Sequence, residues 1–270
     1  MSFTITFIGG GNMARAIIGG LASKSFLPQN IHVIDPNAGQ IDDLVATHHI
    51  NGSTALTEEA ARSDVIIWAI KPQIMKQVAS SVQLQNKDAL HISIAAGIRT
   101  DDLAAWTGNE NIVRIMPNTP ALIGAGVSGI YAGDGINQDQ RNKAELIAGT
   151  LGSHFWLANE NEMDDVTAIS GSGPAYIFHF LEGYQNAIKS LGYSDDRSRE
   201  LAIFVAEGAL ALAKHMGIDF KTLREQVTSK GGTTEAAIKQ LDACQTQEAI
   251  KTAIDAAKNR AIEMSKEFSK

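Results

Sequence analysis

Two glycine-bearing segments have residue types and spacing suited to ligand binding, and the first begins at Gly9. Gly9, Gly11 and Ala14 fit the pattern G-x-G-x-x-G/A directly after the apolar run 3–8. The first glycine permits a tight turn from strand to helix, the second lets the backbone approach a diphosphate, and the small third residue lets helix and strand pack closely. The N-terminus of the following helix adds N–H groups and a partial positive charge. The segment therefore predicts a dinucleotide site whose contacts are Ile8, Gly9, Gly10, Gly11, Asn12 and Met13.

An acidic residue stands where such a site needs one. Asp35 lies 21 positions after Ala14 and directly follows the apolar run 31–34. A carboxylate there accepts the ribose hydroxyls and repels a 2′-phosphate, so the chemistry favours NAD(H). In the alternative interpretation, Asp35 only begins the turn Asp35-Pro36-Asn37. Both NAD(H) and NADP(H) therefore stay open as cofactors.

The second glycine segment, Gly231-Gly232-Thr233-Thr234-Glu235, has the pattern of a loop that enters a helix. Glycines allow unusual backbone dihedrals, and consecutive N–H groups that point at one place form a nest for a carboxylate. The competing interpretation is a helix cap, in which threonine hydroxyls bind the free N–H groups of the first turn. The two roles are compatible.

Short apolar runs alternate with helical stretches in the first half of the chain. The predicted strands are 3–8, 31–34, 64–69, 90–94 and 112–115, followed by 127–131 and 154–157 around a helix at 138–151. Apolar strands separated by helices indicate a parallel sheet covered on both faces. We therefore predict an α/β fold whose N-terminal Rossmann domain, with a mostly parallel sheet, spans residues 1–159.

From about residue 160 the β-rich runs stop. Helices are predicted at 173–191, 195–216, 220–228, 233–241 and 247–268. The segment 202–213 is apolar almost all round, so it belongs in a core or at a subunit interface. The alternatives are an obligate dimer and the central helix of a monomeric bundle. We predict that residues 160–270 form an all-helical domain for dimerisation and substrate binding.

Composition narrows the class of protein. A net charge of −7 disfavours nucleic-acid binding, although backbone dipoles can still bind a small anion. Cys244 is the only cysteine, which excludes an internal disulfide and favours a reducing compartment. The sequence contains no signal-peptide pattern and no apolar run of about 20 residues that would span a membrane. We expect a cytoplasmic protein with no membrane partner and no metal ligand set.

Further motifs make this sequence more specific than that of a generic Rossmann protein. They are Ala69-Ile70-Lys71-Pro72, Ala95-Ala96-Gly97, Met116-Pro117-Asn118-Thr119-Pro120, Ser170-Gly171-Ser172-Gly173-Pro174-Ala175-Tyr176 and Val227-Thr228-Ser229-Lys230 before the second glycine segment. In this order and spacing the chain resembles the pyrroline-5-carboxylate reductase family over nearly its whole length. The resemblance implies NAD(P)H-dependent reduction of the C=N bond of 1-pyrroline-5-carboxylate to L-proline, the last step of proline biosynthesis. It also implies a homodimer and, in some members, a ring of dimers.

The same resemblance implies roles for individual residues. Residues 69–72 and 95–97 would line the nicotinamide end of the groove, beyond the carboxyl ends of their strands. Lys71 would neutralise phosphate or ribose oxygens, or is a solvated loop lysine. Asn118 would bind the carboxamide or ribose, or only shapes a turn between two prolines.

For the substrate, the resemblance implies a site at residues 229–234. The amides of Gly232, Thr233 and Thr234 would hold the carboxylate, together with Gly231. The Thr234 hydroxyl would bind the ring nitrogen, which makes Thr234 the predicted catalytic residue, and Ser229 would order the loop. A protonated imine is already electrophilic, so no strong acid is required beyond a hydrogen-bonding group.

Two rival functions are considered. A 3-hydroxyacid dehydrogenase has a similar layout but needs a lysine on the helix that follows Ser170–Pro174. Here Ile177 and Phe178 occupy that turn, and the first lysine is Lys189. The other rival is a redox sensor that binds the cofactor without turnover, against which the second glycine segment argues.

Overall fold

The computed structural model describes residues 3–269. The chain divides into two compact units: the sheet unit, which runs to Ser172 and includes the segment from Ala256, and the helical unit, Gly173–Asp255. The predicted boundary lay at 159/160. The division differs because residues 160–172 and 256–269 pack on the sheet unit: Glu160 Oε1 pairs with Arg114 Nη1 at 2.8 Å, and Phe268 packs against an apolar cluster of that unit.

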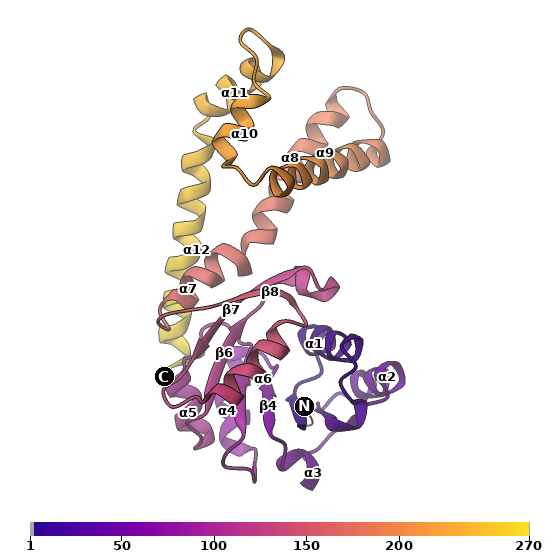
Figure 1. The fold of residues 1–270 in the computed structure, drawn as a ribbon, viewed down its shortest axis with the longest axis vertical. Coiled ribbons are helices and arrows are strands. Elements are labelled where there is room, and N and C mark those ends of the chain that lie inside the picture. The colour runs from indigo at the N-terminus through magenta and orange to yellow at the C-terminus, as the bar shows by residue number, and fades with distance from the viewer. Residues whose placement is uncertain (1–2, 270) are drawn as a thin grey trace. The chain divides into compact units, whose positions relative to one another are not determined.

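An eight-stranded sheet forms the centre of the sheet unit (Figure 1). The strands are β1 Ile5–Ile8, β2 Ile31–Ile34, β3 Asn51–Ser53, β4 Val65–Trp68, β5 Leu90–Ser93, β6 Ile112–Met116, β7 Gly126–Ala132 and β8 Gly152–Trp156. Their order is β3-β2-β1-β4-β5-β6-β7-β8, and every pairing is parallel except β6 with β7. The predicted mostly parallel sheet is therefore confirmed.

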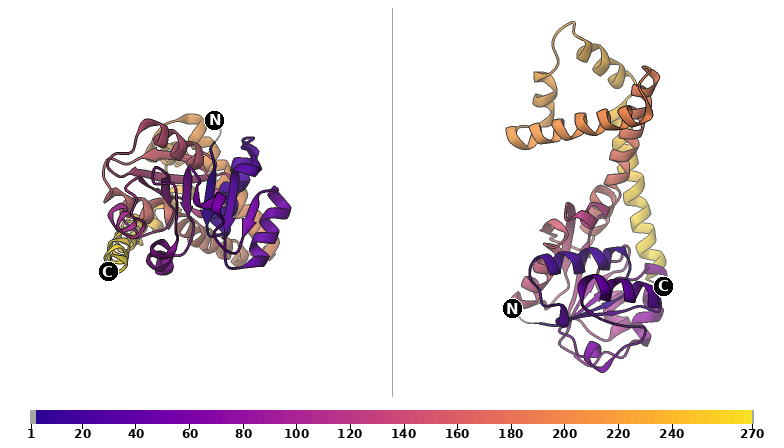
Figure 2. Two further views of the ribbon diagram at one scale, coloured as in Figure 1. Left: turned by 90° about the horizontal axis from the view of Figure 1, so that it is seen from below. Right: turned by 90° about the vertical axis from the view of Figure 1, so that its right-hand side faces the viewer.

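Helices cover both faces of this sheet, as Figures 1 and 2 let the reader follow. The helices of the sheet unit are α1 Asn12–Ser23, α2 Ala38–His48, α3 Glu58–Ala61, α4 Pro72–Ser81, α5 Thr100–Thr107, α6 Gln138–Ala148 and α7 Glu162–Val166, with short turns η1 Pro28–Asn30, η2 Thr119–Ile123 and η3 Thr167–Gly171. Apolar residues of α1, α2 and α6 form one core cluster with the sheet. Those of α4 and α5 form a second cluster, which Phe268 joins. Burial on both faces explains the near-continuous apolar strands.

One strand has no counterpart in the sequence prediction. Strand β3 is short, polar and mostly exposed, and it pairs only with β2, from His32–Asn51 to Ile34–Ser53. Its residues carry no apolar alternation, so the backbone hydrogen bonds of β2 create it. The other predicted elements agree with the structure to within a few residues at each end.

The helical unit contains α8 Gly173–Ser190, α9 Asp195–Met216, α10 Phe220–Gln226, α11 Thr233–Ala243 and the first part of α12, Thr246–Phe268. In α9 only Ser198 and Ala202 are buried, while Phe204 and Leu210 are each 57% exposed. The single chain therefore does not bury this apolar helix, and the interpretation as a monomeric bundle core is wrong. Among the described helices none alone has the length and apolar character of a membrane span; α9 and α10 meet the criterion only as a pair bent by 114°.

Candidate active site

The predicted cofactor residues follow strands that are neighbours in the sheet. Strands β2, β1, β4, β5 and β6 lie side by side and run parallel. In that order, they are followed by Asp35, residues 9–13, residues 69–72, residues 95–97 and Asn118. All these residues therefore lie at one edge of the sheet, around the point between β1 and β4 where the strand order reverses. This is where open α/β sheets bind ligands.

The first glycine segment makes the turn that its sequence predicts. Gly9 has φ +104°, and a Cβ at this position would stand 2.5 Å from the carbonyl oxygen of Ala69 and 2.8 Å from Cγ2 of Ile70. Its N–H donates to the Ile34 carbonyl at 2.8 Å, so the turn continues the ladder with β2. Only glycine fits both the dihedral and the contact. The turn thereby brings the loops after β1 and β4 together.

The space beside Gly11 is open, and Gly11 stands at the start of α1. Gly11 is the N-cap residue of α1, whose first turn has neither a side-chain cap nor an acidic residue. A Cβ on Gly11 would have no heavy atom within 4 Å. The N–H groups of this first turn are therefore uncapped, the arrangement by which helix N-termini bind anions, and a side chain at Gly11 would stand in the open space beside them.

Asp35 is tied to the protein backbone. Its Oδ2 accepts the Gly10 N–H at 2.8 Å and its Oδ1 accepts the Asn37 N–H at 2.9 Å. The second bond is the turn that the alternative interpretation describes. The first joins Asp35 to the glycine segment itself. Each carboxylate oxygen has two lone pairs, so both retain capacity for a ribose hydroxyl.

Lys71 and Asn118 differ in their exposure to solvent and in their hydrogen bonds. Lys71 is exposed and is the N-cap residue of α4, with Pro72 in the first turn. Asn118 is buried: its Nδ2 donates to the Ser170 carbonyl at 3.1 Å, and its Oδ1 accepts the Val127 N–H at 2.9 Å. These bonds hold the segment after β6 to η3 and to the start of β7, so the geometry of Asn118 favours the structural interpretation.

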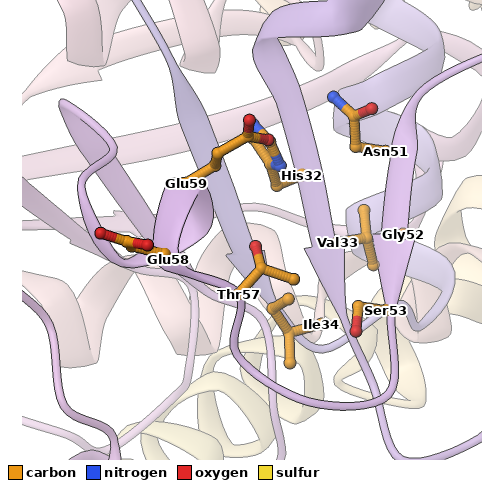
Figure 3. A pocket seen from close by; sticks show the side chains of 9 residues that line it. All are labelled: His32, Val33, Ile34, Asn51, Gly52, Ser53, Thr57, Glu58 and Glu59. Carbon is orange, nitrogen blue, oxygen red and sulfur yellow. The ribbon is translucent and has the colours of Figure 1, made fainter.

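A pocket of about 160 Å³ opens beside β2 and β3 (Figure 3), and its residue Ser53 accepts the Asp35 N–H at 3.3 Å through its carbonyl. It is lined by His32, Val33, Ile34, Asn51, Gly52, Ser53, Thr57, Glu58 and Glu59. None of these residues is a predicted site residue. Burial lowers the pKa of His32, and the nearby Glu59 partly opposes this shift.

In the helical unit, the second glycine segment closes on itself. Gly231 has φ +74°, and its N–H donates to Oε2 of Glu235. The Gly232 N–H donates to the Ser229 carbonyl at 3.0 Å. Ser229 therefore orders the loop through its backbone. The Gly232 amide is already hydrogen-bonded, contrary to its predicted role toward a carboxylate.

The remaining groups are at the start of α11. Gly232 is its N-cap residue, and no side chain caps the helix, so the cap formed by threonine hydroxyls is wrong. Within residues 3–269, no hydrogen bond is found for the amides or hydroxyls of Thr233 and Thr234. The amides of Thr233 and Thr234 are thus available to bind an anionic group. The hydroxyl of the half-buried Thr234 is available to a nitrogen atom of the same ligand.

Glu235 has a role that the sequence analysis missed. Its carboxylate accepts from Gly231 and pairs with Lys239 Nζ at 3.0 Å, and these two contacts lower its pKa in that order. A glutamate at the third helical position that reaches back to the preceding loop is a variant of the capping box. Its position after Gly-Thr-Thr was the available signal.

The fold and these sites define an NAD(P)-dependent oxidoreductase of the Rossmann type with a helical C-terminal unit. The family model "NADP oxidoreductase coenzyme F420-dependent" matches residues 4–97, and "Pyrroline-5-carboxylate reductase dimerisation" matches residues 160–264. The pyrroline-5-carboxylate reductases of Pseudomonas aeruginosa and Haemophilus influenzae are 38% and 40% identical to this chain, covering 98% and 96% of it and 97% of each relative. The chain belongs to the pyrroline-5-carboxylate reductase family.

Solved structures agree with this membership. A pyrroline-5-carboxylate reductase from Coxiella burnetii superposes with a TM-score of 0.90 at 36% identity, covering 98% of this chain and 99% of its own. The Plasmodium falciparum pyrroline carboxylate reductase, solved with NADP bound, superposes with a TM-score of 0.86 at 28% identity and covers 98% of each chain.

Proposed function

We propose that this protein reduces the C=N bond of 1-pyrroline-5-carboxylate to give L-proline, with NADPH or NADH as hydride donor. The nicotinamide supplies the hydride that the imine carbon accepts. The protein's residues supply binding, orientation and a hydrogen bond. Residues 9–13, Asp35, Lys71 and the loops 69–72 and 95–97 would hold the cofactor.

The helical unit would hold the substrate. The amides of Thr233 and Thr234 at the start of α11 bind the carboxylate, and the Thr234 hydroxyl binds the ring nitrogen. Gly231, Ser229 and Glu235 keep the loop in the conformation that presents these groups. The single observation that carries this proposal is this uncapped helix start with an unbonded hydroxyl beside it.

A dehydrogenase acting on 3-hydroxy acids is disfavoured by the position of its required lysine. Lys189 lies in the last turn of α8, and its Nζ pairs with Asp195 at 2.7 Å. The test is the absorbance of NADPH and NADH with 1-pyrroline-5-carboxylate and, separately, with 3-hydroxy acids and the oxidised cofactors. We expect turnover with the imine; turnover with the hydroxy acids alone would overturn the assignment, and no turnover with either would favour the redox sensor.

Thr234→Ala tests the role of the hydroxyl. We expect kcat/KM for the imine to fall at least about tenfold, the value of one lost hydrogen bond, while cofactor affinity is unchanged. Thr233→Ala, which removes the neighbouring hydroxyl, is the matched control. Equal loss of imine turnover and cofactor affinity in Thr234→Ala would refute the role.

The dimerisation model and the exposed apolar residues of α9 support a homodimer. We propose that dimers assemble further into a ring, and that the enzyme acts in the cytoplasm without a membrane partner. The single Cys244, exposed and unable to form an internal disulfide, supports a reducing compartment. Light scattering of the purified protein distinguishes a dimer from a ring.

A further inference from the structure

The loop Ala95–Gly97, at the proposed nicotinamide end of the site, has an unusual backbone conformation. It follows β5, and the Ala95 N–H donates to Ser93 Oγ at 3.3 Å. Gly97 has φ +77°, a region that L side chains rarely adopt. Because a short loop of small residues has few side chains of its own to hold it, its conformation depends on what packs against it.

The end of α12 packs against Gly97. A Cβ on Gly97 would stand 3.0 Å from Cδ2 of Phe268 and 3.4 Å from the carbonyl carbon of Met264. The Phe268 ring also joins the apolar cluster that includes Ile98 and Leu103. The side of the loop on which a side chain would stand is therefore filled by an aromatic ring from the other end of the chain.

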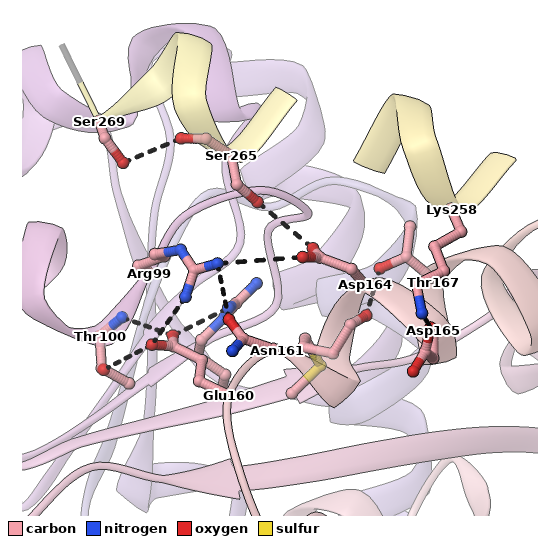
Figure 4. Close-up of polar contacts among 12 residues, drawn as sticks. Arg99, Thr100, Glu160, Asn161, Asp164, Asp165, Thr167, Lys258, Ser265 and Ser269 are labelled. Carbon is pink, nitrogen blue, oxygen red and sulfur yellow. Dashed lines mark hydrogen bonds and ion pairs between the residues drawn. The ribbon is translucent and has the colours of Figure 1, made fainter. Parts of the chain in front are cut away.

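Polar contacts fix this helix end in place (Figure 4). Ser269 Oγ donates to Asp102 Oδ2 at 2.6 Å, in the first turn of α5. The buried Ser265 donates to Asp164 Oδ1 at 3.4 Å. The last turn of α12, which contacts Gly97, is thus held by hydrogen bonds to both α5 and α7.

The far end of the loop has its own anchor. The Thr100 N–H donates to Glu160 Oε1 at 2.8 Å, and the same carboxylate oxygen accepts from Nη1 of the buried Arg114 at 2.8 Å. Figure 4 shows the contacts of Thr100 with Glu160, together with those of Ser265 with Asp164 and with Ser269. Since Thr100 is anchored without Phe268, loss of the ring would free the 95–97 segment while leaving the start of α5 in place.

We propose that Phe268 is a positioning residue for the cofactor, acting through Gly97 on the loop 95–97. This inference takes the position of the nicotinamide from the proposed function, and it takes the support of the loop from the contacts between Phe268 and Gly97. With the ring present, the loop is ordered before the cofactor arrives. Without it, cofactor binding must order the loop as well, which weakens affinity.

The experiment compares Phe268→Ala, Phe268→Leu and the control Lys266→Ala, an exposed residue of the same helix turn. Cofactor affinity is titrated by the fluorescence of NADPH or NADH, whichever the wild type binds more tightly, and Tm is recorded without ligand. We expect Kd to rise at least about fivefold in Phe268→Ala, by an intermediate factor in Phe268→Leu, and not at all in Lys266→Ala. In steady state, KM for the cofactor should rise more than kcat falls.

The outcomes separate positioning from stability. A lower Tm with unchanged Kd in either Phe268 variant would make the ring a merely structural contact and overturn the inference. If Phe268→Ala does not fold, the Phe268→Leu titration decides. The titration needs no imine substrate, so it stands even if the wild type fails to reduce 1-pyrroline-5-carboxylate. If the wild type reduces the imine and Phe268→Ala binds the cofactor with the wild-type Kd, the proposed function stands and the positioning role of Phe268 is refuted.

Discussion

Replacing Gly11 by alanine should separate cofactor affinity from folding stability. Gly11 has φ −70° and ψ −176°, an extended conformation that alanine adopts without strain, and its Cβ would meet no heavy atom within 4 Å. Reduced freedom of the unfolded chain stabilises an alanine variant by about 0.4–1 kcal/mol, whereas alanine is a poorer N-cap residue by a similar amount. We therefore expect the free energy of unfolding to change by less than about 1 kcal/mol.

The same methyl group should weaken cofactor binding. It would occupy the open space through which a diphosphate approaches the N–H groups of the first turn of α1. Losing one hydrogen bond to a charged group costs about 1.5–3 kcal/mol, which corresponds to a Kd increase of roughly tenfold to a hundredfold. Fluorescence titration with NADPH and NADH measures the Kd, and urea denaturation measures the stability.

Gly9→Ala is the contrasting variant. Its φ of +104° and the 2.5 Å approach of its Cβ to the Ala69 carbonyl predict a loss of stability of about 2 kcal/mol or more, with affinity lost as a consequence. If Gly11→Ala bound the cofactor as tightly as the wild type, the diphosphate would not lie at this helix start. If it lost as much stability as Gly9→Ala, the separation of affinity from folding would be refuted.

Three further predictions concern stability and cofactor choice. Burial lowers the pKa of His91 to about 4, so between pH 4 and about pH 6.5 the unfolded chain binds more protons than the folded chain. The free energy of unfolding should therefore fall by about 3 kcal/mol as the pH drops through this range. The lowered pKa values of His32 and His48 act in the same direction. Urea denaturation at a series of pH values should show that the free energy of unfolding depends less steeply on pH in His91→Gln than in the wild type. An unchanged pH dependence would show that His91 is not the source of the effect. Glu160→Gln leaves the buried Arg114 without its carboxylate partner and should lower the free energy of unfolding, measured by urea denaturation, by about 3 kcal/mol. The control Glu58→Gln breaks the exposed pair Arg62–Glu58 and should lower it by less than about 1 kcal/mol. Equal losses in the two variants would contradict this reasoning. Asp35→Ser removes the acceptor of the Gly10 N–H and a repulsive charge, so kcat/KM should shift toward NADPH relative to NADH while affinity for both falls; a constant ratio would leave Asp35 as a turn residue.

Much of the sheet unit follows from local sequence. Apolar runs predict the strands because both faces of a parallel sheet are buried. Gly9 and Gly11 predict the first glycine segment because the turn and the close approach demand residues without a Cβ. The apolar helix at 202–213 also follows from local sequence, but the structure was needed to show that the same chain leaves most of it exposed.

Other features depend on partners far away in the sequence. Strand β3 exists because β2 offers its backbone, Asn118 is occupied because Val127 and Ser170 come beside it, and Gly97 is packed because Phe268 returns to the sheet. Residue types and spacing determined which groups meet at the carboxyl edge of the sheet, since strand ends are set by short-range pattern. Only the tertiary structure decided which of those groups already have hydrogen-bond partners, because a donor or acceptor is satisfied by contacts that the neighbouring sequence does not contain.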